Sequence, residues 1–238
     1  DLQVGATYNY INESVNTDDP NLEPFRATNF DLSYSWYFAE ESLFSAALFY
    51  KKLESLVKTV QVPNVPFKLT NQVTGEVTTI NLIQSGATNS DESAILKGLE
   101  LIYQQPFTFL PGILSNTGMQ FNYTYIDNSV PESLVASSEN SFNVTVYYSD
   151  KQWDARLAYS YRDAYLQNES SGVLPALFVK EQQYLVGSVN YQYSEYLGFN
   201  LAVTNITDEG WGTEYTHGHM DRYSDYGRRF TGGITLKF

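Results

Sequence analysis

The end of the chain constrains the fold more than any other stretch. The last thirteen residues, from Tyr226 to Phe238, read YGRRFTGGITLKF, and from Phe230 every second residue is apolar or small. The positions between them hold Thr231, Gly233, Thr235 and Lys237. A period of two indicates a strand whose two faces meet different surroundings. We expect this segment to be the last strand of a transmembrane β-barrel.

The same alternation recurs in eight upstream segments. These are Phe30–Phe38, Leu43–Lys52, Gly98–Phe107, Gly118–Asp127, Phe142–Tyr148, Trp153–Arg162, Tyr184–Tyr193 and Leu197–Ile206. Their lengths bracket the ~9–11 residues of a tilted transmembrane strand, and none shows a helical period. The expected fold class is therefore all-β, an antiparallel transmembrane β-barrel to which this chain contributes about nine strands.

The connections between these segments alternate in length. Short ones cover 39–42, 149–152 and 194–196, and 108–117 is intermediate. Long ones cover 53–96, 128–141, 163–183 and 207–225. Outer-membrane barrels have short periplasmic turns and long extracellular loops. The pattern therefore predicts that residues 1–29 form an extracellular loop and that residues 30–238 hold the barrel strands.

Aromatic residues support this arrangement. They make up 16% of the chain, and many occupy the apolar face near the ends of the segments. Trp36, Phe44 and Trp153 fall at the periplasmic ends, whereas Phe30 and Phe142 fall at the extracellular ends. Two such belts are typical of the two interfaces of a membrane.

Composition excludes several other functions. A formal net charge of -13 argues against binding to nucleic acid, because few groups could neutralise phosphates. The two histidines, His217 and His219, lie in one predicted loop near Glu214 and Asp221. They could contact a metal, but no further ligand can be assigned, so we predict no resident metal or cofactor. A hydrolase would need a histidine beside a nucleophile, and we predict that the chain is not an enzyme.

Several segments together carry a family resemblance. Residues 21–32 read NLEPFRATNFDL, Trp36-Tyr-Phe follows, and SAALFYKK spans residues 45–52. Further along stand GLELIYQQPF at 98–107, NYTY at 122–125, NITDE at 205–209 and GRRF at 227–230. This ordered series resembles TonB-dependent outer-membrane receptors, especially the proteobacterial subgroup that includes oligosaccharide importers.

The resemblance implies a barrel of about 22 strands, filled by an N-terminal plug and opened by the TonB complex. The present sequence holds neither the plug nor a TonB box, so we interpret it as the C-terminal part of such a barrel. The resemblance also implies that Ile234, Leu236 and Phe238 form the signal read by the barrel-assembly machinery. Further expected partners are outer-membrane lipid and lipopolysaccharide.

Two sets of residues are candidates for ligand or plug contacts. In the last long loop, rings that could bind substrate are Trp211, Tyr215, His217, His219 and Tyr223. Polar residues expected to face the lumen are Gln120, Asn122, Asp154, Arg156, Arg162 and Arg229. A polar interior is what a water-filled or plugged barrel requires.

The resulting hypothesis is active import of a bulky nutrient across the outer membrane. The subgroup resemblance favours an oligosaccharide as the cargo and places a ferric siderophore second. Two alternatives stay open: a passive porin, which would have no plug upstream, and a soluble secreted β-domain used for adhesion. A plug preceding residue 1 would rule out the porin alternative. If the chain stays folded without detergent, the membrane-protein hypothesis is wrong.

Overall fold

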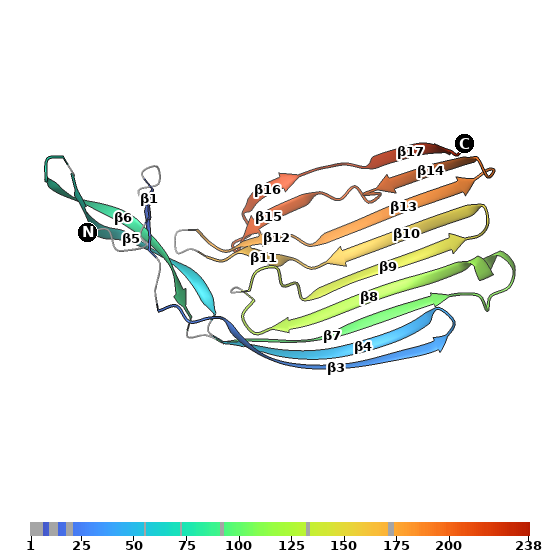
Figure 1. Cartoon of the computed structure of the whole chain (residues 1–238), viewed down its shortest axis with the longest axis horizontal. Helices are drawn as coiled ribbons and strands as arrows, with labels where there is room; N and C mark the ends of the chain where they lie inside the picture. The colour runs from blue at the N-terminus through green and yellow to red at the C-terminus, as the bar shows by residue number, and fades with distance from the viewer. Residues whose placement is uncertain are drawn as a thin grey trace.

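One large antiparallel sheet dominates the structure, a computed structural model that describes residues 7–9, 14–17, 21–54, 56–71, 73–90, 93–131, 134–170 and 174–238. Its strands follow the order β17-β14-β13-β10-β9-β8-β7-β4-β3, so neighbours in space are neighbours among the nine predicted strands (Figure 1). They are β3 (Arg26–Ala39), β4 (Ser42–Glu54), β7 (Ala94–Pro106), β8 (Thr117–Asn128), β9 (Asn140–Ser149), β10 (Trp153–Arg162), β13 (Gln182–Gln192), β14 (Leu197–Thr204) and β17 (Arg229–Leu236). The all-β prediction and all nine predicted strands are confirmed.

The strand register keeps the two faces separate across the whole sheet. Leu48 of β4 lies opposite Leu32 of β3 and Leu99 of β7. At the other side of the sheet, Leu201 of β14 lies opposite Val189 of β13. We call the face that carries these residues the apolar face and the opposite one the polar face. A shift of one residue in any strand would have mixed the two, so the alternation in sequence and the pairing in space agree.

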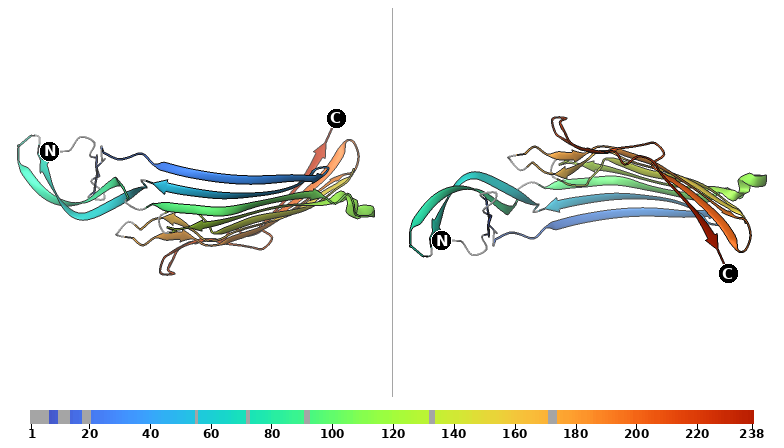
Figure 2. Two further views of the ribbon diagram at one scale, coloured as in Figure 1. Left: turned by 90° about the horizontal axis from the view of Figure 1, so that it is seen from below. Right: turned by 90° about the horizontal axis from the view of Figure 1, so that it is seen from above.

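The connections divide the sheet into two ends. At the short-turn end, β3 joins β4, β9 joins β10 and β13 joins β14 through a few residues, and a 3-10 turn, η1 (Gly112–Asn116), precedes β8. The other connections lie at the long-loop end. Seen edge-on, the sheet is curved along its width (Figure 2). These turns match the short and intermediate connections predicted from sequence.

The long connections contain strands that the sequence did not predict. A hairpin sheet consists of β1 (Thr7–Asn9), β2 (Ser14–Asn16), β5 (Val57–Thr70) and β6 (Val77–Asn89), in the order β1-β2-β6-β5. It projects beyond the long-loop end of the large sheet (Figures 1 and 2). The alternation of β5 is interrupted by a register shift between Val62 and Val65, where Asn64 has a φ of 59°. That irregularity explains why the segment did not stand out.

A second small sheet, which we call the loop sheet, also lies at the long-loop end. It consists of β11 (Tyr165–Asn168), β12 (Leu177–Val179), β15 (Trp211–Tyr215) and β16 (Met220–Ser224), in that order. Its strands come from two long connections, 163–181 and 205–228, which therefore fold against each other. Strands of three to five residues are too short for a period of two to be recognised reliably.

Buried side chains are concentrated in these small sheets and at the long-loop end. Leu166 and Val179 of the loop sheet are 1% and 2% exposed, and Leu53, Leu56 and Ala94 form another buried cluster. On the apolar face of the large sheet, by contrast, Leu32 is 58% exposed. Among the described residues, no helix is long and apolar enough to cross a membrane. The described part of the chain leaves large side chains of the apolar face exposed.

Candidate functional site

The polar face brings together the residues predicted to face the lumen. Gln120 lies opposite Gln104 and Thr145, and Asn122 lies opposite Asn143. In the neighbouring strands, the pairings are Asp154 with Asn190, Arg156 with Ser188, Arg162 with Gln182 and Arg229 with Thr204. Following these pairs from strand to strand shows that all six predicted residues share one face of the sheet. Whether that face lines a lumen stays a prediction.

A polar recess of about 310 Å³ lies on this sheet near the short-turn end. Its lining includes Asp154, Asn190, Asn200, Gln192 and Lys237. The Asp154 carboxylate pairs with the Arg156 guanidinium at 3.4 Å and accepts a hydrogen bond from Asn190 at 3.4 Å. Both contacts are long and exposed, so the side chains keep donors and acceptors for another partner. The sequence singled out Asp154 among the residues that line the recess but missed Asn190, Gln192 and Asn200.

The loop sheet separates the five predicted substrate-binding residues instead of gathering them. Trp211 and Tyr215 occupy the same face of β15, whereas Tyr223 lies opposite Gly212 and therefore on the other face. His217 and His219 are exposed in the turn between β15 and β16. Within the described part of the chain, no group of three or more His, Cys, Asp or Glu residues could hold a metal ion. A shared binding role for these five rings stays a prediction.

Tyr215 has a structural partner within the loop sheet. Its hydroxyl donates a hydrogen bond to Asp221 at 3.1 Å, and the buried hydroxyl of Thr213 donates to the same carboxylate at 3.0 Å. The hydrogen bond to Asp221 raises the pKa of Tyr215. Asp221 thus joins the two strands of the β15–β16 hairpin and holds the Tyr215 hydroxyl.

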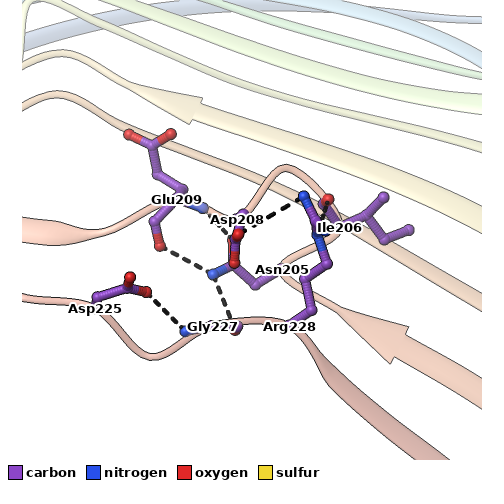
Figure 3. A network of polar contacts seen from close by, with 7 residues as sticks. All are labelled: Asn205, Ile206, Asp208, Glu209, Asp225, Gly227 and Arg228. Atoms are coloured by element: carbon purple, nitrogen blue, oxygen red, sulfur yellow. Dashed lines mark hydrogen bonds and ion pairs between the residues drawn. The ribbon is translucent and has the colours of Figure 1, made fainter.

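A clasp around Asn205 fixes both ends of the last long connection. The Asn205 amide donates to the carbonyl of Glu209 at 2.9 Å and to the carbonyl of Gly227 at 3.2 Å, and it accepts from the Glu209 amide at 2.8 Å (Figure 3). Asn205 is 9% exposed and has a φ of 56°, a conformation that asparagine tolerates better than most residues. The loop that carries β15 and β16 therefore leaves and re-enters the large sheet at one fixed point.

Arg228 strengthens the same clasp. Its Nε donates to the carbonyl of Ile206 at 2.9 Å, and its guanidinium lies 3.7 Å from the Asp208 carboxylate (Figure 3). The segments NITDE at 205–209 and GRRF at 227–230 both contributed to the family resemblance, but their separation in sequence gave no sign that they touch. Only the fold brings these two segments together.

A second polar network ties β10 to the neighbouring loops. Arg162 donates to the Ser138 hydroxyl at 2.7 Å and to the Ala136 carbonyl at 2.6 Å, and its guanidinium lies 3.9 Å from the centre of the Tyr165 ring. These contacts bind the 134–139 segment to β11. The sequence had assigned Arg162 to the lumen, and the structure shows that it is already engaged by these loops at the edge of the polar face.

Asp163, the next residue, completes this network. Its carboxylate accepts hydrogen bonds from the backbone and side chain of Asn140, both at 2.8 Å, and from the Tyr161 hydroxyl at 2.7 Å. Burial raises the pKa of Asp163, but the hydrogen bonds from Tyr161 and Asn140 outweigh it, so the pKa lies below its ordinary value. The charged carboxylate is thus part of the folded loop structure.

The residues of the predicted assembly signal lie at a free edge of the sheet. Ile234 and Leu236 occupy the apolar face of β17, opposite Phe199 and Leu197, and Phe238 follows the strand in a fully exposed position. Within the described residues, β17 and β3 each pair with a strand on one side alone. Recognition of these residues by the barrel-assembly machinery stays a prediction.

Comparison with known proteins gives a family and a set of similar structures. The profile described as TonB dependent receptor-like, beta-barrel, matches residues 3–232. No curated protein sequence matches the chain. The siderophore receptor PirA from Acinetobacter baumannii is similar over 94% of this chain and 33% of its own, with 16% identity and a TM-score of 0.67.

Two further receptors show the same likeness. The ferric-catecholate import receptor Fiu from E. coli is 17% identical over 92% of this chain and 29% of its own, with a TM-score of 0.63. A variant of the ferric enterobactin receptor PfeA from Pseudomonas aeruginosa, in complex with enterobactin, is 13% identical over 94% of this chain and 33% of its own, with a TM-score of 0.65. At such identities the likeness concerns the fold alone. The chain spans about a third of the length of these receptors.

Proposed function

This chain belongs to the TonB-dependent receptor family, whose barrels are outer-membrane proteins, and from this premise we propose that it forms C-terminal strands of an outer-membrane receptor that imports a bulky nutrient. One observation carries the proposal. The described residues leave the apolar face of nine paired strands uncovered, while Asn122, Asp154 and Arg156 share the opposite face. A sheet with these two faces separates lipid from a polar interior.

The two edges of the sheet indicate how it is completed. In lipid, unpaired backbone groups at an edge are costly, so a membrane barrel closes on itself. In our proposal β3 and β17 pair with the other strands of the receptor, and residues 30–238 are its C-terminal barrel region. Part of the predicted extracellular loop 1–29 pairs with the β5–β6 hairpin through β2, while residues 1–6, 10–13 and 18–20 lie outside the described residues.

The polar face supports a role in contacting a plug. The recess formed by Asp154, Asn190 and Lys237 offers both a carboxylate and an ammonium to a segment inside the barrel. In our proposal that segment belongs to an N-terminal plug, through which the TonB complex opens the receptor. A passive porin would have no such plug, and the polar face would then contact water alone.

Two kinds of cargo are proposed. A ferric siderophore is now the first candidate, because the similar solved structures include several siderophore receptors. An oligosaccharide is the second, because it rests on the resemblance between short sequence segments. Exposed rings of the loop sheet, such as Tyr223 at 57% exposure, could stack on either a sugar or an aromatic siderophore.

A growth and uptake assay tests this proposal. Cells that lack their own receptors would express the full-length protein and be given radiolabelled ferric siderophores or oligosaccharides. We expect accumulation of one of these compounds, and we expect it to stop when TonB is absent. Uptake that continues without TonB would identify a porin, and correct folding of the full-length protein in water without detergent would exclude a membrane receptor altogether.

A further inference from the structure

An uncharged patch interrupts the polar face near the middle of the large sheet. Within the described strands β8 and β9, the register places no charged side chain on this face. Gln120 of β8 lies opposite Gln104 of β7. Asn122, the next residue of β8 on this face, lies opposite Asn143 of β9. We call these four residues the amide patch. It is separate from the polar recess, which lies farther along the sheet on β10, β13, β14 and β17.

The side chains of the amide patch are available to a ligand. Gln120, Asn122 and Asn143 are exposed, and among the described residues none of the three forms a side-chain hydrogen bond. Gln104 uses one donor, on the carbonyl of Glu41 at 3.3 Å. Each amide group has an acceptor oxygen and two N–H donors, so the patch presents both kinds of partner. A hydroxyl group also donates and accepts, and a ligand rich in hydroxyls therefore matches this surface.

An aromatic ring lies along the wall beside the amide patch. Gly118 precedes Gln120 by two positions on β8 and lies opposite Tyr147 of β9. A side chain at position 118 would overlap the end of the Tyr147 ring. The ring therefore lies over this glycine, which is buried although Gln120 beside it is exposed. The outer face of the ring is turned away from the sheet, and a flat ligand can stack on it.

The charges around the amide patch do not favour an anionic ligand. Arg156 lies opposite Tyr147, but its guanidinium is 3.4 Å from the Asp154 carboxylate, which offsets its charge. On the other side of the patch, Glu100 of β7 lies opposite Thr124 of β8. An anionic ferric catecholate would meet this carboxylate and be repelled by it. A neutral sugar carries no charge, so its hydroxyls and its ring alone decide how well it fits.

We propose that Tyr147 and the amide patch bind a neutral sugar ring of the cargo on the inner wall of the barrel. The sugar stacks on Tyr147, and its hydroxyls form hydrogen bonds with Gln120 and Asn122. Gly118 is a positioning residue, because it lets the Tyr147 ring lie against the wall. The inference rests on the proposed function, because the polar face must line the path of the cargo. It favours the second of the two proposed cargoes, an oligosaccharide.

Equilibrium binding to the purified full-length receptor in detergent tests the site. The probes are neutral hexasaccharides of glucose, mannose, xylose or N-acetylglucosamine, with ferric enterobactin as the anionic probe. We expect a neutral probe to bind, and Tyr147→Ala to weaken its binding roughly three- to tenfold through the loss of stacking. Gln120→Leu/Asn122→Leu removes two amide groups and should weaken it roughly tenfold. Asn29→Leu is the matched control and should bind like wild type, because Asn29 is an exposed amide on the same face at the long-loop end.

Two further variants separate the position of the ring from its presence. Tyr147→Phe keeps the ring and should keep most of the binding. Gly118→Ala displaces the ring, so it should weaken sugar binding about as much as Tyr147→Ala does. Added to Tyr147→Ala, it should weaken binding no further, because the two changes act on one contact. A full additional loss in that double variant would show that Gly118 does not act through Tyr147. Should Gly118→Ala not assemble, the comparison of Tyr147→Ala with Tyr147→Phe decides the role of the ring.

Several results would overturn the proposal. These are no binding of any neutral probe, unchanged affinity in both Tyr147→Ala and the amide double variant, or an equal loss in Asn29→Leu. Binding of ferric enterobactin that is sensitive to these variants, in place of sugar binding, would assign the wall to an anionic cargo instead. TonB-dependent uptake is measured on the same proteins. Uptake of a compound whose binding none of the variants changes refutes the site alone, whereas variant-sensitive sugar binding without TonB-dependent uptake refutes the proposed function alone.

Discussion

The large sheet and the loop sheet differ in how far their apolar side chains are buried by the chain. In the large sheet, Leu32 and Leu201 on the apolar face are 58% and 54% exposed. In the loop sheet, Leu166 and Val179 are almost fully buried by neighbouring strands of the same chain. The large sheet thus depends on its surroundings to cover one face, while the loop sheet forms its own small core. This contrast suits a protein whose strands lie in lipid and whose loops lie in water.

The strongest test of this contrast compares two variants that place the same charge on opposite faces of one strand. Phe121→Lys puts an ammonium on the apolar face of β8, and Asn122→Lys puts the same group on the polar face. A lysine near the middle of the bilayer costs about 2–4 kcal/mol on the lipid side, and the lost ring adds to that. We expect Phe121→Lys to abolish assembly in the outer membrane and Asn122→Lys to permit it, as measured by the folded, heat-modifiable band. Equal assembly of the two variants would show that the faces are assigned wrongly.

A cavity in the loop sheet should have a large but local effect. Leu166→Ala removes a side chain that is 1% exposed, and such truncations cost about 2–5 kcal/mol in a well-packed core. We expect the variant to assemble normally but to expose the connections 163–181 and 205–228 to protease on intact cells. The control is Leu174→Ala, because Leu174 is 57% exposed in the same loop. A failure of Leu166→Ala to insert would mean that the two sheets fold as one unit.

The sequence predicted the large sheet but not the loop sheet, because the two differ in strand length and in the contacts that position their strands. Every strand of the large sheet was predictable because its apolar face repeats over ten or so residues, and the loop lengths indicated which ends belong together. The loop sheet was not predictable, because Leu177–Val179 and the other strands of that sheet are too short to show a period. Its position depends on contacts between distant segments, such as the bond from Asn205 to Gly227. The predicted polar residues share one face because they belong to long strands, whereas the predicted loop rings are separated by a hairpin whose register no pattern revealed.

The Asn205 clasp provides a smaller test at the junction of the two regions. Asn205→Ala leaves the partly buried carbonyls of Glu209 and Gly227 without their donor, and a typical hydrogen bond contributes about 0.5–1.5 kcal/mol. We expect faster hydrogen exchange in the 205–228 connection and unchanged exchange in β13 and β14. Asn205→Asp keeps the acceptor for the Glu209 amide but sets a carboxylate oxygen against the two carbonyls, so its exchange should be at least as fast as that of Asn205→Ala. Faster exchange across the large sheet would show that the clasp supports the strands as well as the loop.

The smallest expected effect is a dependence of the loops on pH. Because the pKa of Asp163 is lower in the folded protein than its ordinary value of 3.8, the ionised carboxylate stabilises the fold. That contribution is fully present above the unfolded pKa and is lost as the pH falls through the folded pKa. Protease resistance of the 134–139 segment should therefore be constant near neutral pH and fall in acid below about pH 4. In Asp163→Asn the carboxylate is absent, so resistance should start lower and fall less over the same range. A wild-type loop that opens already near pH 6 would point to a different group, because the aspartate is still ionised there and its bonds to Asn140 and Tyr161 are intact.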